Sequence, residues 1–356
     1  VLPTVAAQLQ ADDPATAVPA PQSQENTGSS AEGPESAPPP GDGPSADGPP
    51  ADGPPTPQVQ SPLVPQAGGR SIGDPYAPEL GNTGYDVQQY LLQLALDPAV
   101  DIVQGAATLE AIATLHGLAE LSLDFAGYQI TSVTVDGLAA GFERKDKKVI
   151  VTLPEPLAEG ERFSLTVAYR GQPLYEPSPY VGFVDHLGLT YPDEASIYAL
   201  AEPDGARYWF PANDHPRDKA TFRFELVVPQ GLTAAANGRL LETRQGAMPD
   251  GRPGELFVWE HLYPMAPYLA TVAVGEYERL DDTSPDGVPL RHYTFPEARD
   301  DLLVAASEIG QSLDWMAEQF GPYPFENFGY VTARVPGGSL ETQTLVILSD
   351  AMIGKR

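Results

Sequence analysis

The residues of this 356-residue chain that could carry chemistry lie in two short segments. The first, at 201–226, is AEPDGARYWFPANDHPRDKATFRFEL and gathers charged side chains around an aromatic, proline-rich turn. The second, at 320–350, is FGPYPFENFGYVTARVPGGSLETQTLVILSD and places Gly337 and Gly338 just before Glu341. A glycine pair lets the backbone approach a ligand closely, and a nearby carboxylate can pair with a cation. The second segment therefore indicates a site for a cationic ligand.

Each segment also has a purely structural interpretation. The first can be a rigid corner between strands, with Trp209 and Phe210 in the core and Arg207 paired to a carboxylate. The second can be an ordinary glycine-rich hairpin turn. Taken alone, neither segment identifies a function.

Other catalytic chemistries have no complete set of residues. The histidines are scattered singly, with no second His or Cys at metal-ligand spacing: His116, His186, His215, His261 and His292. The sequence contains no HExxH, no GxSxG, no P-loop and no cysteine, so thiolate metal sites, cysteine nucleophiles and disulfides are excluded. We therefore expect no metal to be bound by these residues, and the histidines to be surface or structural groups.

The charge balance narrows the possible partners. The formal net charge is −29, from 49 acidic and 20 basic residues. This charge repels phosphate backbones and anionic membranes, which disfavours nucleic-acid binding and is compatible with a cationic ligand such as an amine. Acidity that only keeps the protein soluble is the alternative. No apolar run approaches the roughly 18 residues of a transmembrane segment.

Residues 1–74 are predicted to form a disordered Pro/Ala/Gly/Asp-rich spacer. Residues 1–72 contain 16 of the 39 prolines and no aromatic residue, so they cannot bury enough apolar surface to offset the entropy of ordering. A long tether ahead of a folded domain favours an extracellular or cell-envelope location, with a cytoplasmic one as the alternative. Because the sequence starts at Val1, any signal peptide or anchor is expected upstream.

From about Tyr76 the sequence changes to short runs in which apolar and polar residues alternate, separated by Gly, Pro and Asp. This pattern predicts an antiparallel β-sandwich or curved sheet. The clearest runs are at 85–96, 108–115, 120–125, 129–137, 148–153 and 163–171, and similar runs continue to about Leu280. The turn-forming stretch DDTSPDG at 281–287 is the best boundary signal, so a β domain is expected at 75–284.

After this boundary the apolar spacing becomes helical. Leu302, Ala306, Ile309, Leu313, Met316 and Phe320 lie at offsets of four or three residues and predict one amphipathic helix over 297–320. Strands are expected at 330–335 and 344–349. One helix and two strands cannot cover a core, so residues 285–356 are interpreted as the start of a larger α+β domain that the sequence cuts short.

Together, in this order and behind a β domain, the two segments resemble the aminopeptidase N family of zinc peptidases, the gluzincins that include leukotriene hydrolase. GARYWFPANDHPRDKATF is similar to the family's Arg-aromatic-Pro-x-x-Asp-x-Pro-x-x-Lys-Ala-x-Phe segment. FGPYPFENFGYVTARVPGGSLET is similar to the Phe-Gly-x-Tyr-Pro lead into the GxMEN motif. The resemblance covers about residues 78–356. It implies a saddle-like N-terminal domain followed by the beginning of a thermolysin-like catalytic domain.

The resemblance also implies a substrate-binding site. Gly338, Ser339, Leu340, Glu341 and Thr342 align with GxMEN. Glu341 would bind the α-ammonium of a peptide, and the backbone of Gly338 and Ser339 would pair with the substrate main chain. Glu202 would reach the same amine from the N-terminal domain. Leu340 replaces Met and Thr342 replaces Asn, which affects fine substrate preference more than amine binding.

In this family the zinc-binding HExxH helix follows GxMEN, so the zinc ligands are expected beyond Arg356. The implied function is the N-terminal part of a zinc aminopeptidase that removes N-terminal residues from peptides with a free N-terminus. This chain alone is then expected to be inactive. The alternatives are a non-catalytic binding or scaffold module with the same architecture, and an adhesion sandwich unrelated to peptidases.

Overall fold

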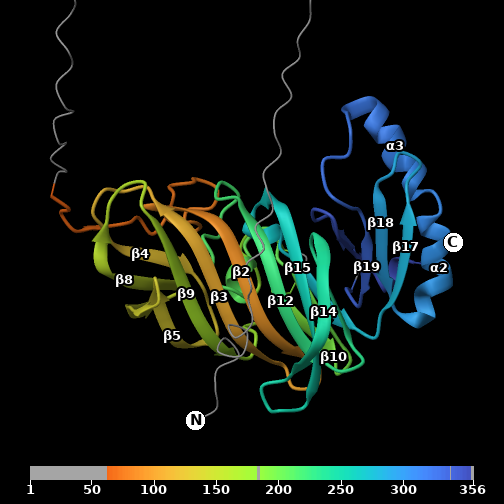
Figure 1. The fold of residues 1–356 in the computed structure, drawn as a ribbon, viewed down its shortest axis with the longest axis horizontal. Coiled ribbons are helices and arrows are strands. Elements are labelled where there is room, and N and C mark those ends of the chain that lie inside the picture. The colour runs from red at the N-terminus through yellow and green to blue at the C-terminus, as the bar shows by residue number, and fades with distance from the viewer. Residues whose placement is uncertain (1–61, 183–184, 337, 354–356) are drawn as a thin grey trace, which may run out of the picture. The chain divides into compact units, whose positions relative to one another are not determined.

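The computed structural model describes residues 62–182, 185–336 and 338–353. Most of the spacer predicted for residues 1–74 lies outside these ranges. Its last part is ordered, because β1 (Gln66–Ala67) pairs in parallel with β4 (Leu118–Asp124). The predicted mostly β architecture is confirmed, with the described strands arranged in four sheets (Figure 1).

The largest sheet has eight strands in the order β14-β15-β12-β2-β3-β9-β5-β6. Their bounds are β2 (Tyr85–Asp97), β3 (Ile102–Ala113), β5 (Gln129–Val135), β6 (Leu138–Ala139), β9 (Arg162–Gly171), β12 (Ala220–Pro229), β14 (Arg239–Ala247) and β15 (Pro253–Met265). Figure 1 shows the long strands side by side. Within this sheet one pair departs from the predicted antiparallel arrangement, because β12 pairs with β2 in parallel.

Two four-stranded sheets complete the β domain. One has the order β1-β4-β8-β7, with β7 (Gly141–Lys145) and β8 (Lys148–Leu157). The other has the order β10-β11-β16-β13, with β10 (Gly188–Asp193), β11 (Ser196–Leu200), β13 (Thr233–Ala236) and β16 (Val272–Gly275). The second of these sheets is buried along most of β11, β13 and β16 and the first contributes side chains of β4 and β8 to the same core, whereas β7 is exposed throughout. Within this core Phe222 stacks on Tyr90 at 4.9 Å and lies 5.8 Å from Phe224, measured between ring centroids.

The fourth sheet has five strands in the order β17-β18-β19-β21-β20. Their bounds are β17 (Glu278–Thr283), β18 (Pro289–Thr294), β19 (Tyr330–Ala333), β20 (Ser339–Leu340) and β21 (Val346–Ser349). The stretch 281–287, predicted to separate two domains, instead ends β17 and turns into β18 within one hairpin. β16 is the last strand of the β domain and β17 the first strand of the fourth sheet, so the chain passes from one to the other near residue 276. The residue range of each domain stays a prediction.

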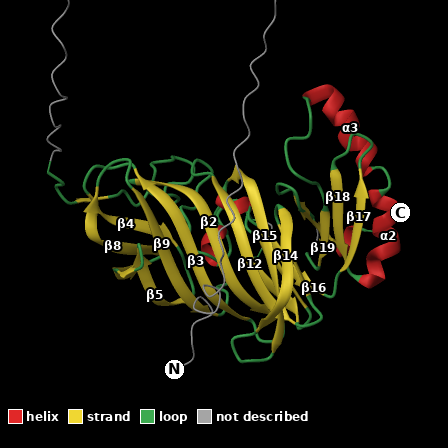
Figure 2. Cartoon of the chain, viewed as in Figure 1, coloured by secondary structure: helices red, strands yellow, loops and turns green. Residues whose placement is uncertain are grey.

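The helical segment lies beside this fourth sheet (Figure 2). The prediction of one continuous helix over 297–320 is wrong, because this segment forms two helices. A 3-10 turn (Pro296–Ala298) leads into α2 (Arg299–Ala306), and a break at residues 307–308 separates it from α3 (Ile309–Phe320). Leu302 is fully buried, whereas Met316 and Phe320 at the other end of the predicted apolar face are 53% and 83% exposed. The expected face is therefore fully covered at Leu302, half-buried at Ala306, Ile309 and Leu313, and exposed at its end.

Candidate functional site

Glu202 lies at one end of the β10-β11-β16-β13 sheet. It follows β11 by two residues, and its side chain is exposed. Tyr268 lies close enough that burial and the negative charge of Glu202 together raise the pKa of its hydroxyl. Strands β11 and β13 both pair antiparallel with β16, so the ends of β11 and β13 lie beside the start of β16. Glu202 therefore lies at the sheet end that also contains Asn237 and Thr271.

The segment Gly338–Thr342 lies at the edge of the fourth sheet. Ser339 and Leu340 form β20, which pairs only with β21, Leu340 lying opposite Ile347. Gly338 has a φ of +97° and open space around its Cα, a conformation that favours glycine. Leu340 is buried, as an apolar replacement for Met should be, whereas Glu341 is exposed and accepts a 2.6 Å hydrogen bond from the Ser339 hydroxyl. The carboxylate is thus presented to solvent from a backbone edge.

Thr342 connects this edge to the β domain. Its side chain is 6% exposed, and its hydroxyl accepts a hydrogen bond from Asn237 Nδ2 at 3.1 Å. The same Asn237 Nδ2 donates to the Gln343 carbonyl at 2.8 Å. On its other side, Asn237 Oδ1 accepts from the Thr271 amide at 2.7 Å. A single buried amide thereby joins the sheet end near Glu202 to the residues that follow Glu341.

A second group of contacts holds the same junction. The Gly238 amide donates to Thr344 Oγ1 at 2.7 Å. The Gly238 carbonyl accepts hydrogen bonds from Asn327 Nδ2 at 2.9 Å and from the Arg291 guanidinium, which also lies 4.6 Å from the centroid of the Trp259 ring. Buried polar groups that are paired in this way favour one relative arrangement of the joined elements. The junction is therefore a specific docking surface and not only an apolar contact.

His261 adds a third connection. The ring is fully buried, with Nδ1 3.0 Å from Glu326 Oε1 and Nε2 2.7 Å from Gln343 Oε1. Burial raises the pKa of the Glu326 carboxyl, but the hydrogen bond from His261, a backbone hydrogen bond and the charges of His261 and Arg239 together lower the pKa overall. The imidazole of β15 thus bridges two residues of the following unit.

The structure therefore brings the two segments of the predicted site to one junction. Glu202 follows the sheet end that holds Asn237, and Glu341 directly precedes the Thr342 that Asn237 binds. The contact of both carboxylates with a single amine stays a prediction. The residues that form the junction, Asn237, His261, Thr271 and Gln343, were not found from the sequence, because each pairs with residues far along the chain.

The first segment also has the structural role that its alternative interpretation predicted. Trp209 and Phe210 are fully buried, and Arg207 Nε lies 3.5 Å from Asp214 Oδ2. Burial raises the pKa of Asp214 to about 7, although Arg207 opposes this. Asp124, also fully buried, pairs with Lys148 at 2.6 Å. This corner is a buried charge network that holds strands together.

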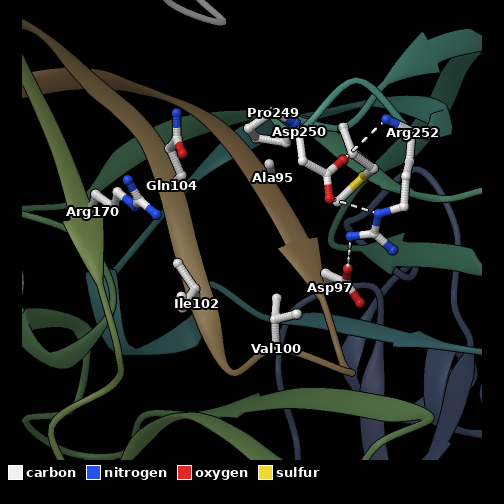
Figure 3. A pocket seen from close by; sticks show the side chains of 10 residues that line it. Ala95, Asp97, Val100, Ile102, Gln104, Arg170, Pro249, Asp250 and Arg252 are labelled. Carbon is white, nitrogen blue, oxygen red and sulfur yellow. Dashed lines mark hydrogen bonds and ion pairs between the residues drawn. The ribbon is translucent and has the colours of Figure 1, made fainter.

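Two cavities lie away from the predicted site. One of about 210 Å³ at the β2–β3 hairpin is lined by Asp97, Asp250, Arg252, Gln104, Arg170 and apolar side chains (Figure 3). Its Arg252 is already paired, to Asp97 at 2.5 Å and to Asp250 at 2.6 Å. The other, of about 430 Å³, is lined by Pro78, by the acidic residues Glu79 and Asp146, and by five basic residues: Arg70, Lys145, Lys147, Lys148 and Arg207. Most of these also have carboxylate partners.

The described residues do not fit a zinc ion. Within residues 62–182, 185–336 and 338–353, no three His, Asp or Glu side chains are grouped so as to hold a metal. The histidines are engaged separately: His215 contacts Asp74, His186 contacts Thr190, and His261 contacts Glu326. His292 is buried, which lowers its pKa to about 4, and its Nδ1 accepts from the Tyr330 amide. The described residues alone therefore support no metal-dependent catalytic step.

The fold and the first segment correspond to a known family. The model of the Peptidase M1 N-terminal domain matches residues 85–269, just over half of the chain. The chain therefore belongs to this family. The match ends at the 3-10 turn η2 (Pro267–Leu269), before β16, so it covers most of the β domain and leaves out the fourth sheet.

Individual relatives are M1 aminopeptidases. Glutamyl aminopeptidase of Mus musculus is 26% identical over 215 residues, which cover 54% of this chain and 22% of the relative. The crystal structure of an M1 zinc metallopeptidase from Deinococcus radiodurans is 29% identical with a TM-score of 0.68, covering 80% of this chain and 64% of that one. A mutant of that enzyme bound to a Tyr-Ser-Ala substrate has a TM-score of 0.69.

The chain corresponds to only part of each of these longer relatives. The chain spans about a fifth of the length of the curated glutamyl aminopeptidases that it matches. Yeast LTA4 hydrolase in complex with bestatin is similar at 17% identity and a TM-score of 0.62, which supports the fold alone. The architecture of the chain is therefore aminopeptidase-like. None of the helices in the described part of the chain has the length and apolar character that a membrane span requires.

Proposed function

We propose that this chain supplies the amine-anchoring part of a zinc aminopeptidase that acts on peptides with a free N-terminus. In this proposal Glu341 and Glu202 pair with the substrate ammonium, and the edge formed by Gly338, Ser339 and Leu340 receives the substrate main chain. The observation that carries it is the junction, where Asn237 joins the residue after Glu341 to the sheet end near Glu202. The M1 aminopeptidases among the relatives support the same class of activity.

The electrostatics of the two carboxylates suit this role. Both side chains are exposed and therefore accessible to a ligand. A carboxylate at a solvent-exposed edge gains roughly 1 kcal/mol from one ammonium ion, and two carboxylates around the same ammonium gain more. Anchoring the chain end in this way would leave only the first peptide bond within reach of a catalytic group. The bond-breaking zinc, in this proposal, is held by residues outside the described part of the chain.

The test compares two peptides that differ only in the charge of the N-terminus. Tri-alanine and N-acetyl-tri-alanine are titrated against the 356-residue chain at low ionic strength and followed by saturation-transfer difference NMR. We expect the free-amine peptide to bind about tenfold more tightly, and each of Glu341→Gln and Glu202→Gln to reduce this preference about fivefold. Glu155→Gln, at an exposed residue of β8 in another sheet, is the matched control.

The outcomes separate the proposal from its main alternative. A scaffold module that lost amine recognition would bind both peptides equally, and Glu341→Gln would change nothing. If the preference exists but survives both substitutions, the amine is bound elsewhere and the roles of Glu341 and Glu202 are wrong.

A further inference from the structure

The position of Glu341 depends on more than its own strand. β20 contains only two residues and lies at the sheet edge. It is paired to β21 through Ser339 and Leu340, with one further hydrogen bond of 3.2 Å from the Ser349 amide to the Gly338 carbonyl. Short edge strands are held weakly by their own ladder, because one side has no hydrogen-bond partner. The residues after Glu341 must therefore be held by other contacts if its carboxylate is to keep a fixed place.

Asn237 provides the first of these contacts with every polar atom of its side chain. Nδ2 donates to Thr342 Oγ1 and to the Gln343 carbonyl, and Oδ1 accepts from the Thr271 amide. The residue is fully buried, so water cannot replace these partners. Thr271 Oγ1 in turn donates to the Ala199 carbonyl at 2.9 Å, three residues before Glu202. One continuous hydrogen-bonded path thus leads from the neighbourhood of one carboxylate to that of the other.

His261 provides an independent contact to the same turn. Its Nε2 lies 2.7 Å from the Gln343 side-chain amide, and its Nδ1 lies 3.0 Å from Glu326. An amide group can present either its oxygen or its NH2, so it can pair with this nitrogen whether the ring is neutral or protonated. His261 thereby holds the side chain of Gln343, while Asn237 holds the backbone carbonyl of the same residue.

We infer that Asn237 and His261 are positioning residues, which fix the turn after Glu341 so that its carboxylate and that of Glu202 face the same substrate amine. This inference rests on the proposed function and extends it to residues that do not touch the substrate. Loss of either side chain removes buried hydrogen bonds and leaves the turn free to move. The consequence should be a selective loss of amine recognition, because the peptide main chain would still meet the β20 edge.

The experiment measures the ratio of dissociation constants for N-acetyl-tri-alanine and tri-alanine with the 356-residue chain. In Asn237→Ala and in His261→Ala we expect this ratio to fall at least threefold, without a matching loss of affinity for the acetylated peptide. Asn82→Ala is the control, since Asn82 is a buried amide whose partners include Asp124 and Asn213, none of them at the junction. It should lower stability and leave the ratio unchanged.

Thr342→Val is the variant to use if Asn237→Ala fails to fold, because it keeps the shape and removes the hydroxyl that accepts from Asn237 and donates to the Leu345 carbonyl. A double substitution, Asn237→Ala with Glu341→Gln, should lower the ratio of dissociation constants no further than Glu341→Gln alone. If Glu341→Gln reduces the ratio while Asn237→Ala, His261→Ala and Thr342→Val all keep it, this inference is overturned and the proposed function survives. If Glu341→Gln itself has no effect, the proposed function is the part that fails.

Discussion

At the scale of single residues, the junction depends on a glycine that no other residue can replace. Gly238 has a φ of +85°, and a Cβ added there would lie 2.0 Å from the Glu260 carbonyl oxygen. Its amide binds Thr344, which lies between β20 and β21, and its carbonyl binds Asn327, which lies just before β19. The close approach of this backbone to β15 and the hydrogen bonds across the junction therefore require the same position to have no side chain.

We predict that Gly238→Ala lowers the free energy of unfolding by roughly 3 kcal/mol or more, because left-handed strain and a backbone clash add together. Gly231→Ala is the matched control, since Gly231 has a φ of +95° and no atom within 4 Å of an added Cβ. It should cost only about 1 kcal/mol. Urea unfolding of both variants measures the difference, and equal costs would show that the clash is relieved by a small shift of β15.

A buried carboxyl gives the stability of the chain a defined pH dependence. Burial raises the pKa of Asp218 from 3.8 to about 7, although its hydrogen bond with Asn213 opposes the shift. Between these pH values the folded form keeps the proton that the unfolded form has released. Asp218 therefore costs no stability at acidic pH, and its cost grows as the pH rises from about 4 to about 7.

We predict that Asp218→Asn, which cannot ionise, gains stability relative to the native chain as the pH rises through this window. The relative gain between pH 4.5 and 7.5 should be on the order of 2–4 kcal/mol. Urea unfolding at both pH values provides the measurement. Parallel pH profiles for the two chains would mean that Asp218 is ionised in the fold, despite its burial.

At the scale of elements, α3 has an apolar surface that the described residues leave uncovered. Trp315, Met316 and Phe320 are 59%, 53% and 83% exposed. Exposed apolar side chains gathered on one helix favour association, because contact with another apolar surface removes them from water. The sequence pattern placed Met316 and Phe320, but not Trp315, on the predicted apolar face, and the structure leaves both of these residues exposed.

We predict that the 356-residue chain self-associates through α3. Replacing Trp315, Met316 and Phe320 together by Gln should weaken association at least tenfold in sedimentation velocity experiments. The control is a triple replacement by Gln of Leu138, Phe142 and Leu241, which are 61%, 44% and 43% exposed on β strands. If this control reduces association equally, general surface hydrophobicity and not α3 is responsible.

Strand positions could be predicted from the sequence more reliably than strand partners. Alternation of apolar and polar residues is a local signal, and the run at 85–96 is β2 almost to the residue. The pairing of β2 with β12 is a long-range property with no local signal, so the parallel register was missed. The helix break at residues 307–308 was missed for a related reason, since Ser and Glu are compatible with a continuous helix.

At the scale of the whole molecule, the same contrast holds for the site. The segments that contain Glu202 and Glu341 could be found from the sequence, because residue types and spacing mark them. The residues that bring these segments to one junction could not be found. Asn237 and His261 look ordinary in the sequence and gain their role only from partners 34 to 106 residues away.

The parallel pairing of β2 with β12 has a consequence for folding during synthesis on the ribosome. β3 follows β2 directly and covers one of its edges, whereas β12 begins more than a hundred residues later. At typical rates of translation, the second edge of β2 remains unpaired for on the order of ten seconds before β12 has been synthesised. During that time a long apolar edge is open to pairing with other nascent chains. This interval is where a chaperone would matter most.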